Sequence, residues 1–480
     1  MNHHYLLPDV SQPGKIGCSL PALDVPPTEL PSNELIRQEL ELPEVSEVEL
    51  IRYFTALSKL NYGVDTGFYP LGSCTMKYNP KWHEDIAKLA GFALIHPLQP
   101  EESIQGALQL MFELQEYLTE ITSMHTTSLV PIAGAHGEFA SLLLVKAYHQ
   151  DQGDKARKKI LLTDSSHGTN PASAVMCGFE IGVVASDSEG NVDMKSLESA
   201  MNEEVAALTL TMPTTLGLFD PKILEIGQLV HERGGLLGAD GANLNALLGR
   251  AKFGELGYDY VQLNLHKTFS TPHGGGGPGS GPVCVKENLT DFLPSPLVTK
   301  NSERYKFVSP AKSIGRIANF YGNFGVMCKA YAYIRSLGAE GLKEVSENAV
   351  LNANYLKEKL KPYYYLPYDR VCMHEVVFSA RRQKAKGVRT VDIAKRLLDY
   401  GLHPPTVYFP LVVDEALMIE PTETESKQTL DAFIEAMKEI ARDVEENPEI
   451  LHTAPHSTPV KRLDDVRAAR DPDLRWRMRS

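Results

Sequence analysis

The sequence predicts an α/β fold: a mostly parallel sheet covered by helices on both faces, followed by a smaller α+β domain. Between about residues 115 and 300, apolar strands alternate with helical stretches, a pattern typical of parallel sheets. From about residue 330, a long helical pattern leads into a region with few strands. The chain has 480 residues, more than one hydrophobic core usually holds, so a large domain and a smaller one are expected.

Apolar runs mark the elements of the large domain in chain order. Strands are expected over residues 159–163, 180–185, 205–212, 236–240, 259–265 and 282–286. Helices are expected over residues 138–149, 194–202 and 222–233. Because a helical stretch separates several of these strands, we expect most of the sheet to be parallel.

The small domain begins with a helical pattern from Tyr331 to Leu360. Its clearest strands are at 376–378 and 407–409, and a helix is expected from Lys427 to Glu445. The acidic residues at 420–425 directly precede this last helix. We therefore interpret them as its N-terminal cap.

The chain as a whole divides into five predicted parts. They are an extended Pro-rich arm (1–46), a helical and loop segment (47–114), the large domain (115–329), the small domain (330–452) and a polar, Arg-rich tail (453–480). Within the second part, residues 61–80 carry Gly, Pro, Ser and Thr, which indicates a long loop. A loop of that length inside a compact chain is often functional.

The composition excludes several classes of function. Hydrophobic residues make up 43% and charged residues 23% of the chain, as in ordinary globular proteins. The net charge of −13 argues against nucleic acid or an anionic membrane as a partner. The six cysteines include no CxxC pair, which favours reduced thiols over a disulfide framework or a metal site. With no signal peptide or membrane span indicated, we expect a cytoplasmic protein.

Lys267 is the first candidate functional residue. It follows the apolar run 260–265 and precedes a segment with the glycines 274–277. Such a segment lets the backbone approach a bulky ligand closely, while the strand holds the stem of the lysine. A lysine in this setting can form a Schiff base with a carbonyl cofactor such as pyridoxal phosphate (PLP). A lone lysine at a strand end would more simply be a surface residue, but three further segments upstream support the functional interpretation.

Asp240 ends the apolar run that begins at Leu236. An acid at such a place can bond the pyridine nitrogen of PLP and keep it protonated, so that the ring acts as an electron sink. The alternative is an aspartate that caps the next turn. The 27 residues between Asp240 and Lys267 fit one strand–crossover–strand unit. Both residues would then lie at carboxyl ends of parallel strands, where open α/β sheets bind their ligands.

Two more segments could complete a cofactor site. His167 follows the strand 159–163 and could lie flat on an aromatic ring, although Ser, Thr and Asn around it are also ordinary helix-capping residues. The segment 132–138 (IAGAHGE) precedes an apolar helix, and small residues at a helix start expose N–H groups to an anion. It is therefore a candidate phosphate-binding site, although many helices begin with glycine.

These four segments together resemble one family. The pieces AGAHGE, SSHGTNPASA, DGANLNALLG and NLHKTFSTPHGGGGPG are similar to the PLP site of glycine dehydrogenase (decarboxylating), the P-protein of the glycine cleavage system. The resemblance covers nearly the whole chain and is specific. Further matching segments are 20–26, 69–77, 321–325, 418–427 and 458–465.

In this family the P-protein is either one long chain or two shorter subunits. The present chain has subunit length and carries the lysine, so it resembles subunit 2, which corresponds to the C-terminal half of the long form. Where the long form tends to have a Thr-His-Gly segment, this chain reads Thr214-Thr215-Leu216-Gly217. That departure fits the two-subunit branch and removes one candidate histidine.

The resemblance implies a fold-type-I, PLP-dependent transferase-like domain and assigns roles to the motif residues. Lys267 would carry PLP, Asp240 would bond the ring nitrogen and His167 would stack on the ring. The remaining cofactor-binding candidates are the backbone groups of Ala135 and His136 for the phosphate, His266 and Asn243 beside the two central residues, and Thr211 for the ring hydroxyl. A structural role for Thr211 and for its neighbour Thr214 is as good an interpretation. Arg316 is a candidate contact for the substrate carboxylate, against the simpler interpretation of a surface arginine.

The implied activity is that of glycine dehydrogenase (aminomethyl-transferring). Glycine loses CO2, and its aminomethyl group passes to the lipoyl arm of the H-protein. The implied partners are subunit 1, in a heterodimer doubled into a heterotetramer, and the lipoylated H-protein. Two alternatives remain from the residues alone: another fold-type-I amino-acid decarboxylase or aldolase, and a catalytically silent scaffold subunit. Lys267 and Asp240 argue against the second, because a silent subunit needs neither.

Overall fold

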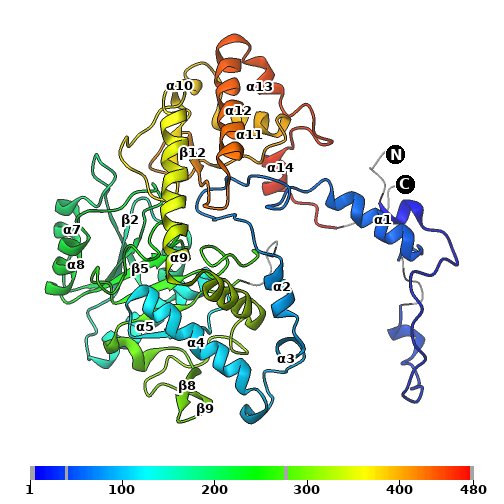
Figure 1. The fold of residues 1–480 in the computed structure, drawn as a ribbon, viewed down its shortest axis with the longest axis horizontal. Helices are drawn as coiled ribbons and strands as arrows, with labels where there is room; N and C mark the ends of the chain where they lie inside the picture. The colour runs from blue at the N-terminus through cyan, green and yellow to red at the C-terminus, as the bar shows by residue number, and fades with distance from the viewer. Residues whose placement is uncertain (1–5, 38–39, 41, 275–278, 476–480) are drawn as a thin grey trace. The chain divides into compact units, whose positions relative to one another are not determined.

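The computed structural model describes residues 6–37, 40, 42–274 and 279–475, and its contacts divide the chain into two units, Met1–Gly67 and Phe68–Ser480 (Figure 1). Three of the four glycines at 274–277 lie outside the described residues. No helix in the described ranges is both long enough and apolar enough to cross a membrane.

The first unit has little regular structure. Its elements are η1 (Leu7–Val10), η2 (Asn33–Leu35) and α1 (Glu47–Ser58). Helix α1 begins at a capping box, in which the Ser46 hydroxyl accepts a hydrogen bond from the Glu49 amide and the Glu49 carboxylate accepts one from the Ser46 amide. Most of the residues before α1 are exposed, in line with the predicted extended arm.

A seven-stranded sheet organises the second unit. Its strands are β1 (Thr126–Ser128), β2 (Lys159–Thr163), β3 (Glu180–Val184), β4 (Val205–Thr211), β5 (Leu236–Gly241), β6 (Tyr260–Leu263) and β7 (Val283–Val285). The order is β1-β7-β6-β5-β4-β2-β3, and neighbouring strands from β6 to β3 run parallel. Strand β7 pairs antiparallel with β6 and β1. This arrangement confirms the predicted mostly parallel sheet.

Two separate cores cover the two faces of this sheet. Successive residues of β2 alternate between them: Ile160 and Leu162 belong to one core and Leu161 to the other. The core with Leu161 includes residues of α4 (Gln105–Thr122), α7 (Met194–Ala200), α8 (Ile223–Glu232) and the first half of α9 (Phe324–Leu360). The opposite core includes α5 (Gly134–Asp151), α6 (Thr169–Met176) and η4 (Glu287–Phe292).

Helix α9 connects the large sheet to the small one, as Figure 1 shows in yellow. It is broken at Gly338, whose φ of 62° is not helical. The small sheet has the order β10-β12-β11 and is antiparallel, with β10 (Val376–Ser379), β11 (Thr406–Val407) and β12 (Ala416–Ile419). The other elements around it are α10 (Arg381–Lys384), α11 (Thr390–Asp399), α12 (Lys427–Glu446), α13 (Glu449–Thr453) and, further on, α14 (Asp465–Arg470).

The remaining elements flank the large sheet. They are α2 (Trp82–Ala87), α3 (Ala90–Ala93), η3 (Glu101–Ser103) and the hairpin of β8 (Leu297–Asn301) and β9 (Arg304–Val308). The sequence patterns predicted neither this hairpin nor the short strands β1 and β12. Helices α4 and α9 each continue across a predicted division, at 114 and at 329. The five-part division of the chain stays a prediction.

Gly217 joins the large sheet to the small domain. Its φ is +72°, and its carbonyl accepts a hydrogen bond from the Met373 amide at 2.7 Å. A Cβ atom at this position would lie 2.0 Å from the Glu375 carbonyl oxygen. Both the backbone conformation and the space therefore require glycine here.

We predict that Gly217→Ala lowers the free energy of unfolding by roughly 2–5 kcal/mol, because left-handed strain and steric overlap add. Gly387→Ala is the matched control, since Gly387 has a φ of +87° but a Cβ atom there would meet nothing within 4 Å. That variant should lose only about 1–2 kcal/mol, the cost of the left-handed conformation. Urea unfolding of both variants measures the difference, and equal losses would contradict the overlap at Gly217.

Candidate functional site

Lys267 and Asp240 meet at the carboxyl edge of the large sheet. Strands β5 and β6 are parallel neighbours, so the residues that end or follow them lie at the same edge. Asp240 is 4% exposed, and its two carboxylate oxygens accept hydrogen bonds from Asn170 Nδ2 at 3.0 Å and from the Ala242 amide at 3.2 Å. Lys267 Nζ donates to the Ser73 carbonyl oxygen at 2.8 Å. The predicted strand–crossover–strand spacing is therefore confirmed.

Both residues line one cavity of about 180 Å³. Its lining combines residues from the large sheet and the helices beside it, from the small domain and from the loop around residue 73. They are Ser73, Gly134, Ala135, Glu138, His167, Thr169, Thr211, Met212, Pro213, Thr215, Asp240, Ala242, Asn243, Asn264, His266, Lys267, His374 and Glu375.

The cavity thus brings together seven of the eight predicted site residues: Lys267, Asp240, His167, Ala135, Asn243, Thr211 and His266. The eighth, His136, does not line it with its side chain, whose Nδ1 accepts a hydrogen bond from the Ile132 amide at 3.2 Å. Two weaker candidates also lie outside the lining. Thr214 Oγ1 accepts hydrogen bonds from the amides of Leu216 and Leu218, and the Arg316 guanidinium lies 6.0 Å from the centre of the Tyr321 ring.

The N-terminus of α5 opens on this cavity. Gly134 and Ala135 line it, and the N-cap residue Ala133 offers no side-chain cap. The first amides of a helix have no acceptor within the helix, so they are available to an anion. A Cβ atom on Gly134 would lie 2.6 Å from Asn264 Oδ1, so glycine is needed for this close packing.

The histidines around the cavity favour their neutral forms. His167 lies exposed at the mouth, where its Nδ1 is 2.8 Å from Thr169 Oγ1 and partial desolvation lowers its pKa. Burial lowers the pKa of His266 to about 4, with the nearby His273 contributing. Burial also lowers the pKa of His374 to about 3. A neutral imidazole can stack on a ring or accept a hydrogen bond without adding positive charge beside Lys267.

Glu138 and Thr211 present polar atoms that lack a partner in the described part of the chain. Glu138 Oε1 accepts a hydrogen bond from Thr169 Oγ1 at 2.9 Å, but Oε2 is buried and unsatisfied. Burial, and then the charge of Asp240, raise the pKa of Glu138 to about 8, so its carboxyl group is mostly protonated at neutral pH. Thr211 Oγ1 is likewise buried without a partner. Such orphaned groups are typical of a site built for a polar ligand.

Two glutamates of the small domain complete the site, and neither was predicted as functional. Glu375 Oε2 accepts a hydrogen bond from the Ser73 amide at 2.7 Å. Glu420 accepts hydrogen bonds from the amide and hydroxyl of Thr75, both at 2.8 Å, and from Asn243 Nδ2 at 2.8 Å. Together they hold the loop 73–75, in which Ser73 and Thr75 have positive φ values of 65° and 50°.

The interpretation of residues 420–425 as a helix cap is wrong. The side chain of Ser426, not an acidic residue, accepts the hydrogen bond from the Thr429 amide at the start of α12. Glu420 instead directly follows β12, the central strand of the small sheet, and is 1% exposed. Its burial could not be read from the sequence because β12 was not predicted. The signal that could have found it was the resemblance of segment 418–427 to the family.

His374, Glu375 and Glu420 also have the geometry to hold a metal ion. One potential ligand atom from each lies within 4.8 Å of the other two. However, Glu420 and Glu375 already accept hydrogen bonds from loop 73–75, as described above. These bonds account for the orientation of both carboxyl groups without a cation.

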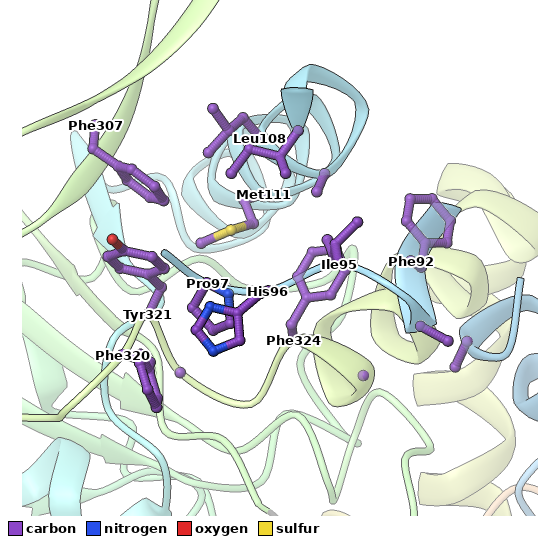
Figure 2. Close-up of a pocket in the computed structure, with 16 residues that line it drawn as sticks. Phe92, Ile95, His96, Pro97, Leu108, Met111, Phe307, Phe320, Tyr321 and Phe324 are labelled. Atoms are coloured by element: carbon purple, nitrogen blue, oxygen red, sulfur yellow. The ribbon is translucent and has the colours of Figure 1, made fainter. Parts of the chain in front are cut away.

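A larger cavity of about 270 Å³ shares no lining residue with the first (Figure 2). Figure 2 shows Leu108 and Met111 of α4 opposite the aromatic rings of Tyr321 and Phe324. Its lining is mostly apolar, and it holds no lysine or carboxylate. It therefore lacks the groups needed for the predicted chemistry, and the smaller, polar cavity is the candidate active site.

Comparison with known proteins identifies relatives over the full chain. The family model of the glycine cleavage system P-protein matches residues 22–306, and that of the glycine dehydrogenase C-terminal domain matches residues 345–458. A probable glycine dehydrogenase (decarboxylating) subunit 2 of Caldanaerobacter subterraneus is 59% identical over 480 residues, which cover 99% of both chains. One from Bacillus velezensis is 59% identical over 476 residues, covering 98% of this chain and 97% of the relative.

Solved structures share the fold at lower identity. The P-protein glycine decarboxylase of the glycine cleavage system, in an inhibitor-bound form, superimposes with a TM-score of 0.71 at 21% identity, covering 85% of this chain and 93% of that one. Glutamate decarboxylase of Lactobacillus brevis has a TM-score of 0.66 at 14% identity, covering 87% and 96%. These neighbours confirm the predicted fold-type-I architecture. The family models and the two close relatives go further and establish that the chain belongs to the glycine cleavage system P-protein family.

Proposed function

We propose that the protein binds PLP through Lys267, decarboxylates glycine and transfers the aminomethyl group to the lipoyl arm of the H-protein. The observation that carries this proposal is the placement of Lys267 and Asp240 at adjacent strand ends in one cavity. A cofactor-anchoring lysine and an acid for the ring nitrogen require this arrangement. The chain belongs to a family whose activity is glycine decarboxylation, and its two close relatives carry that name.

The residues around the cavity fit PLP. The open N-terminus of α5 suits the phosphate, with Ala135 and the amide of His136 as the predicted contacts. The unsatisfied Thr211 Oγ1 suits the ring hydroxyl. Asp240 suits the ring nitrogen, because hydrogen bonds from Asn170 and Ala242 already orient its carboxylate. His167, at the cavity mouth, is the predicted stacking residue, and Asn243 and His266 are the remaining predicted contacts.

Each of these residues has a defined task in the reaction. PLP, when bound, supplies an electron sink for the breaking Cα–carboxylate bond. Asp240 would hold the ring nitrogen in its protonated form through a hydrogen bond from a buried position. The Ser73 carbonyl oxygen holds Lys267 Nζ at the edge of the cavity, and the neutral His266 and His374 add no positive charge there.

Another fold-type-I amino-acid decarboxylase or aldolase is the alternative function, and no observation favours it. The likeness to glutamate decarboxylase, at 14% identity, concerns the fold alone. In contrast, the relatives at 59% identity cover nearly the whole chain. A silent scaffold subunit is also disfavoured, because this chain has both Lys267 and Asp240, which such a subunit would not need.

We also propose that the chain works with a second subunit and with the lipoylated H-protein. The close relatives are named subunit 2, which implies a subunit 1. The described part of the arm before α1 leaves Leu20, Leu23 and Val25 exposed by 84%, 80% and 60%. Burying one such side chain stabilises an interface by roughly 1.5–3 kcal/mol. A heterodimer with subunit 1, doubled by two-fold symmetry, is therefore the proposed assembly.

Lys267→Ala is predicted to lose the covalent yellow chromophore and all measurable glycine decarboxylation, because the variant has no amine at the anchoring position. Borohydride reduction of the wild-type protein followed by peptide mapping should place the modified residue at Lys267. Lys155→Ala, at an exposed lysine, is the control and should keep both properties. Near-normal turnover by Lys267→Ala would show that the assignment is wrong.

Asp240→Asn is predicted to retain PLP but to lose most of its catalytic rate. A charge-assisted hydrogen bond contributes roughly 1.5–3 kcal/mol to binding, but the negative charge on the ring develops mainly in the transition state. The rate should therefore fall more than cofactor affinity does. Absorbance titration with PLP and steady-state kinetics measure the two effects, and normal activity in this variant would contradict the electron-sink role.

The chain alone is predicted to be incompletely active. We expect full H-protein-dependent decarboxylation only after co-expression with subunit 1, in an assembly that buries more than about 2,000 Å². Light scattering gives the mass with and without subunit 1, and labelled glycine gives the activity of each preparation. A stable monomer with full activity by itself would overturn the proposed assembly.

A further inference from the structure

Glu375 and Glu420 form a pair of buried carboxyl groups beside Lys267. They are 2% and 1% exposed, and one oxygen of each lies within 4.8 Å of the other. Burial raises the pKa of both groups, and the charge of Glu420 raises that of Glu375 further. Two carboxylates this close in a buried setting do not both ionise readily. Burial and proximity therefore disfavour two negative charges on the pair, so that one of the two carboxyl groups is favoured to keep a proton, and the two groups titrate together.

Most of the groups that face this pair lower the pKa values of the two glutamates, but burial is the larger effect and raises both. Loop 73–75 contributes two backbone amides, the Thr75 hydroxyl and Cys74, whose thiol pKa is raised by burial. The small sheet contributes His374, which is neutral, with Nε2 3.5 Å from Glu375 Oε1. The large sheet contributes Asn243 and Lys267. Among the described residues, Lys267 is a cation whose charge lowers the pKa of both glutamates.

Glu375 lies at the reacting end of the cavity. Lys267 Nζ contacts the Ser73 carbonyl oxygen at 2.8 Å, and the amide of the same residue contacts Glu375 Oε2 at 2.7 Å. In the proposed function, the nitrogen of glycine would take the place of Lys267 Nζ on the cofactor. The reacting Cα atom of glycine would therefore lie close to the position of Nζ. The pKa of Glu138, the other lining acid with a raised pKa, is affected more by the charge of Asp240, the predicted partner of the ring nitrogen, than by that of Lys267.

The proposed reaction requires one proton to be moved inside this cavity. When the Cα–carboxylate bond breaks, CO2 leaves, and the electron pair forms a bond from Cα to one sulfur of the lipoyl disulfide. The S–S bond then breaks, and the second sulfur leaves with its electron pair and needs a proton to become a thiol. The ammonium group of glycine loses one proton before its nitrogen can react. Protons therefore balance if an acid in the cavity gives its proton to the sulfur and the proton released by the ammonium group then replaces it.

We propose that Glu375, sharing its proton with Glu420, is the acid that protonates the leaving sulfur of the lipoyl disulfide. This role rests on the proposed function and extends it to a residue that the motifs did not indicate. The lining histidines whose pKa values are lowered are poor donors, because they are already neutral. The shared proton also keeps the pair from carrying two negative charges when glycine arrives.

Infrared spectroscopy tests the shared proton without any turnover. The difference spectrum between the wild-type protein and Glu375→Gln, recorded at neutral pH in the absence of substrate, should show the carbonyl stretch of a protonated carboxyl group. Glu425→Gln is the matched control, because burial raises the pKa of Glu425 to about 7 and its carboxyl lies outside the cavity lining. The band assigned to Glu375 should persist in that control. Absence of the band from the wild-type minus Glu375→Gln spectrum would overturn the proposal.

Kinetics of the PLP-loaded assembly with subunit 1 and lipoylated H-protein test the donor role. Exchange of labelled CO2 with glycine does not require the leaving sulfur to be protonated, whereas net transfer does. Glu375→Gln should therefore keep exchange but slow transfer by roughly 100-fold or more, the usual effect of losing a general acid. Equal losses of exchange and transfer, or transfer at the wild-type rate, would overturn the donor role.

The pH profile separates proton donation from a structural effect. Transfer in the wild-type assembly should fall as pH rises through the raised pKa of Glu375, since the donor then loses its proton. Glu420→Gln removes the charge that raises this pKa, so the falling limb should move to lower pH. An unmoved limb would overturn the sharing of the proton.

Failure of the proposed function can be told apart from failure of the shared proton. If the wild-type assembly decarboxylates no glycine, the proposed function fails and the donor role fails with it. The infrared band still decides whether the pair holds a proton.

Discussion

The parallel pairing of β5 with β6 is the constraint on which the site depends. It places Asp240 and Lys267 at one edge of the sheet, although 27 residues separate them. Burial on both faces makes this pairing rigid, since one core packs against Ala239 and Val261 and the other against Leu236 and Tyr260. A buried, well-packed strand pair can hold a charged acid and a lysine at fixed separation, which the proposed chemistry needs.

The small domain closes this edge through buried hydrogen bonds as well as apolar packing. Glu375 and Glu420 extend from its sheet and hold loop 73–75 by hydrogen bonds, and that loop in turn holds Lys267 through the Ser73 carbonyl. The positive φ values at Ser73 and Thr75 are unfavourable for residues with side chains. The hydrogen bonds that the loop donates to the two glutamates offset that cost. Buried acids thus serve both the shape of the site and, as proposed, its proton transfer.

The motif residues were predictable because each follows a local pattern. A lysine after a strand, an acid at a strand end and small residues at a helix start are visible in a few consecutive residues. Seven of the eight predicted site residues accordingly line one cavity. The exception, His136, was proposed for its backbone, and its side chain turns to the Ile132 amide. Patterns of alternating strands and helices likewise predicted the large sheet. The short strand β12 and the β8–β9 hairpin have too few residues to show a recognisable alternation of apolar and polar side chains.

The sequence by itself determined the fold class, the resemblance to one enzyme family and the central pair of Lys267 and Asp240. Only the tertiary structure decided that Glu138, Glu375 and Glu420 belong to the same site, and that Glu420 is not a helix cap. The physical reason is that the pKa of a carboxyl group depends on its burial and on charges nearby in space. Glu420 contacts Thr75, which is 345 residues away in the sequence, and no local sequence pattern predicts that contact.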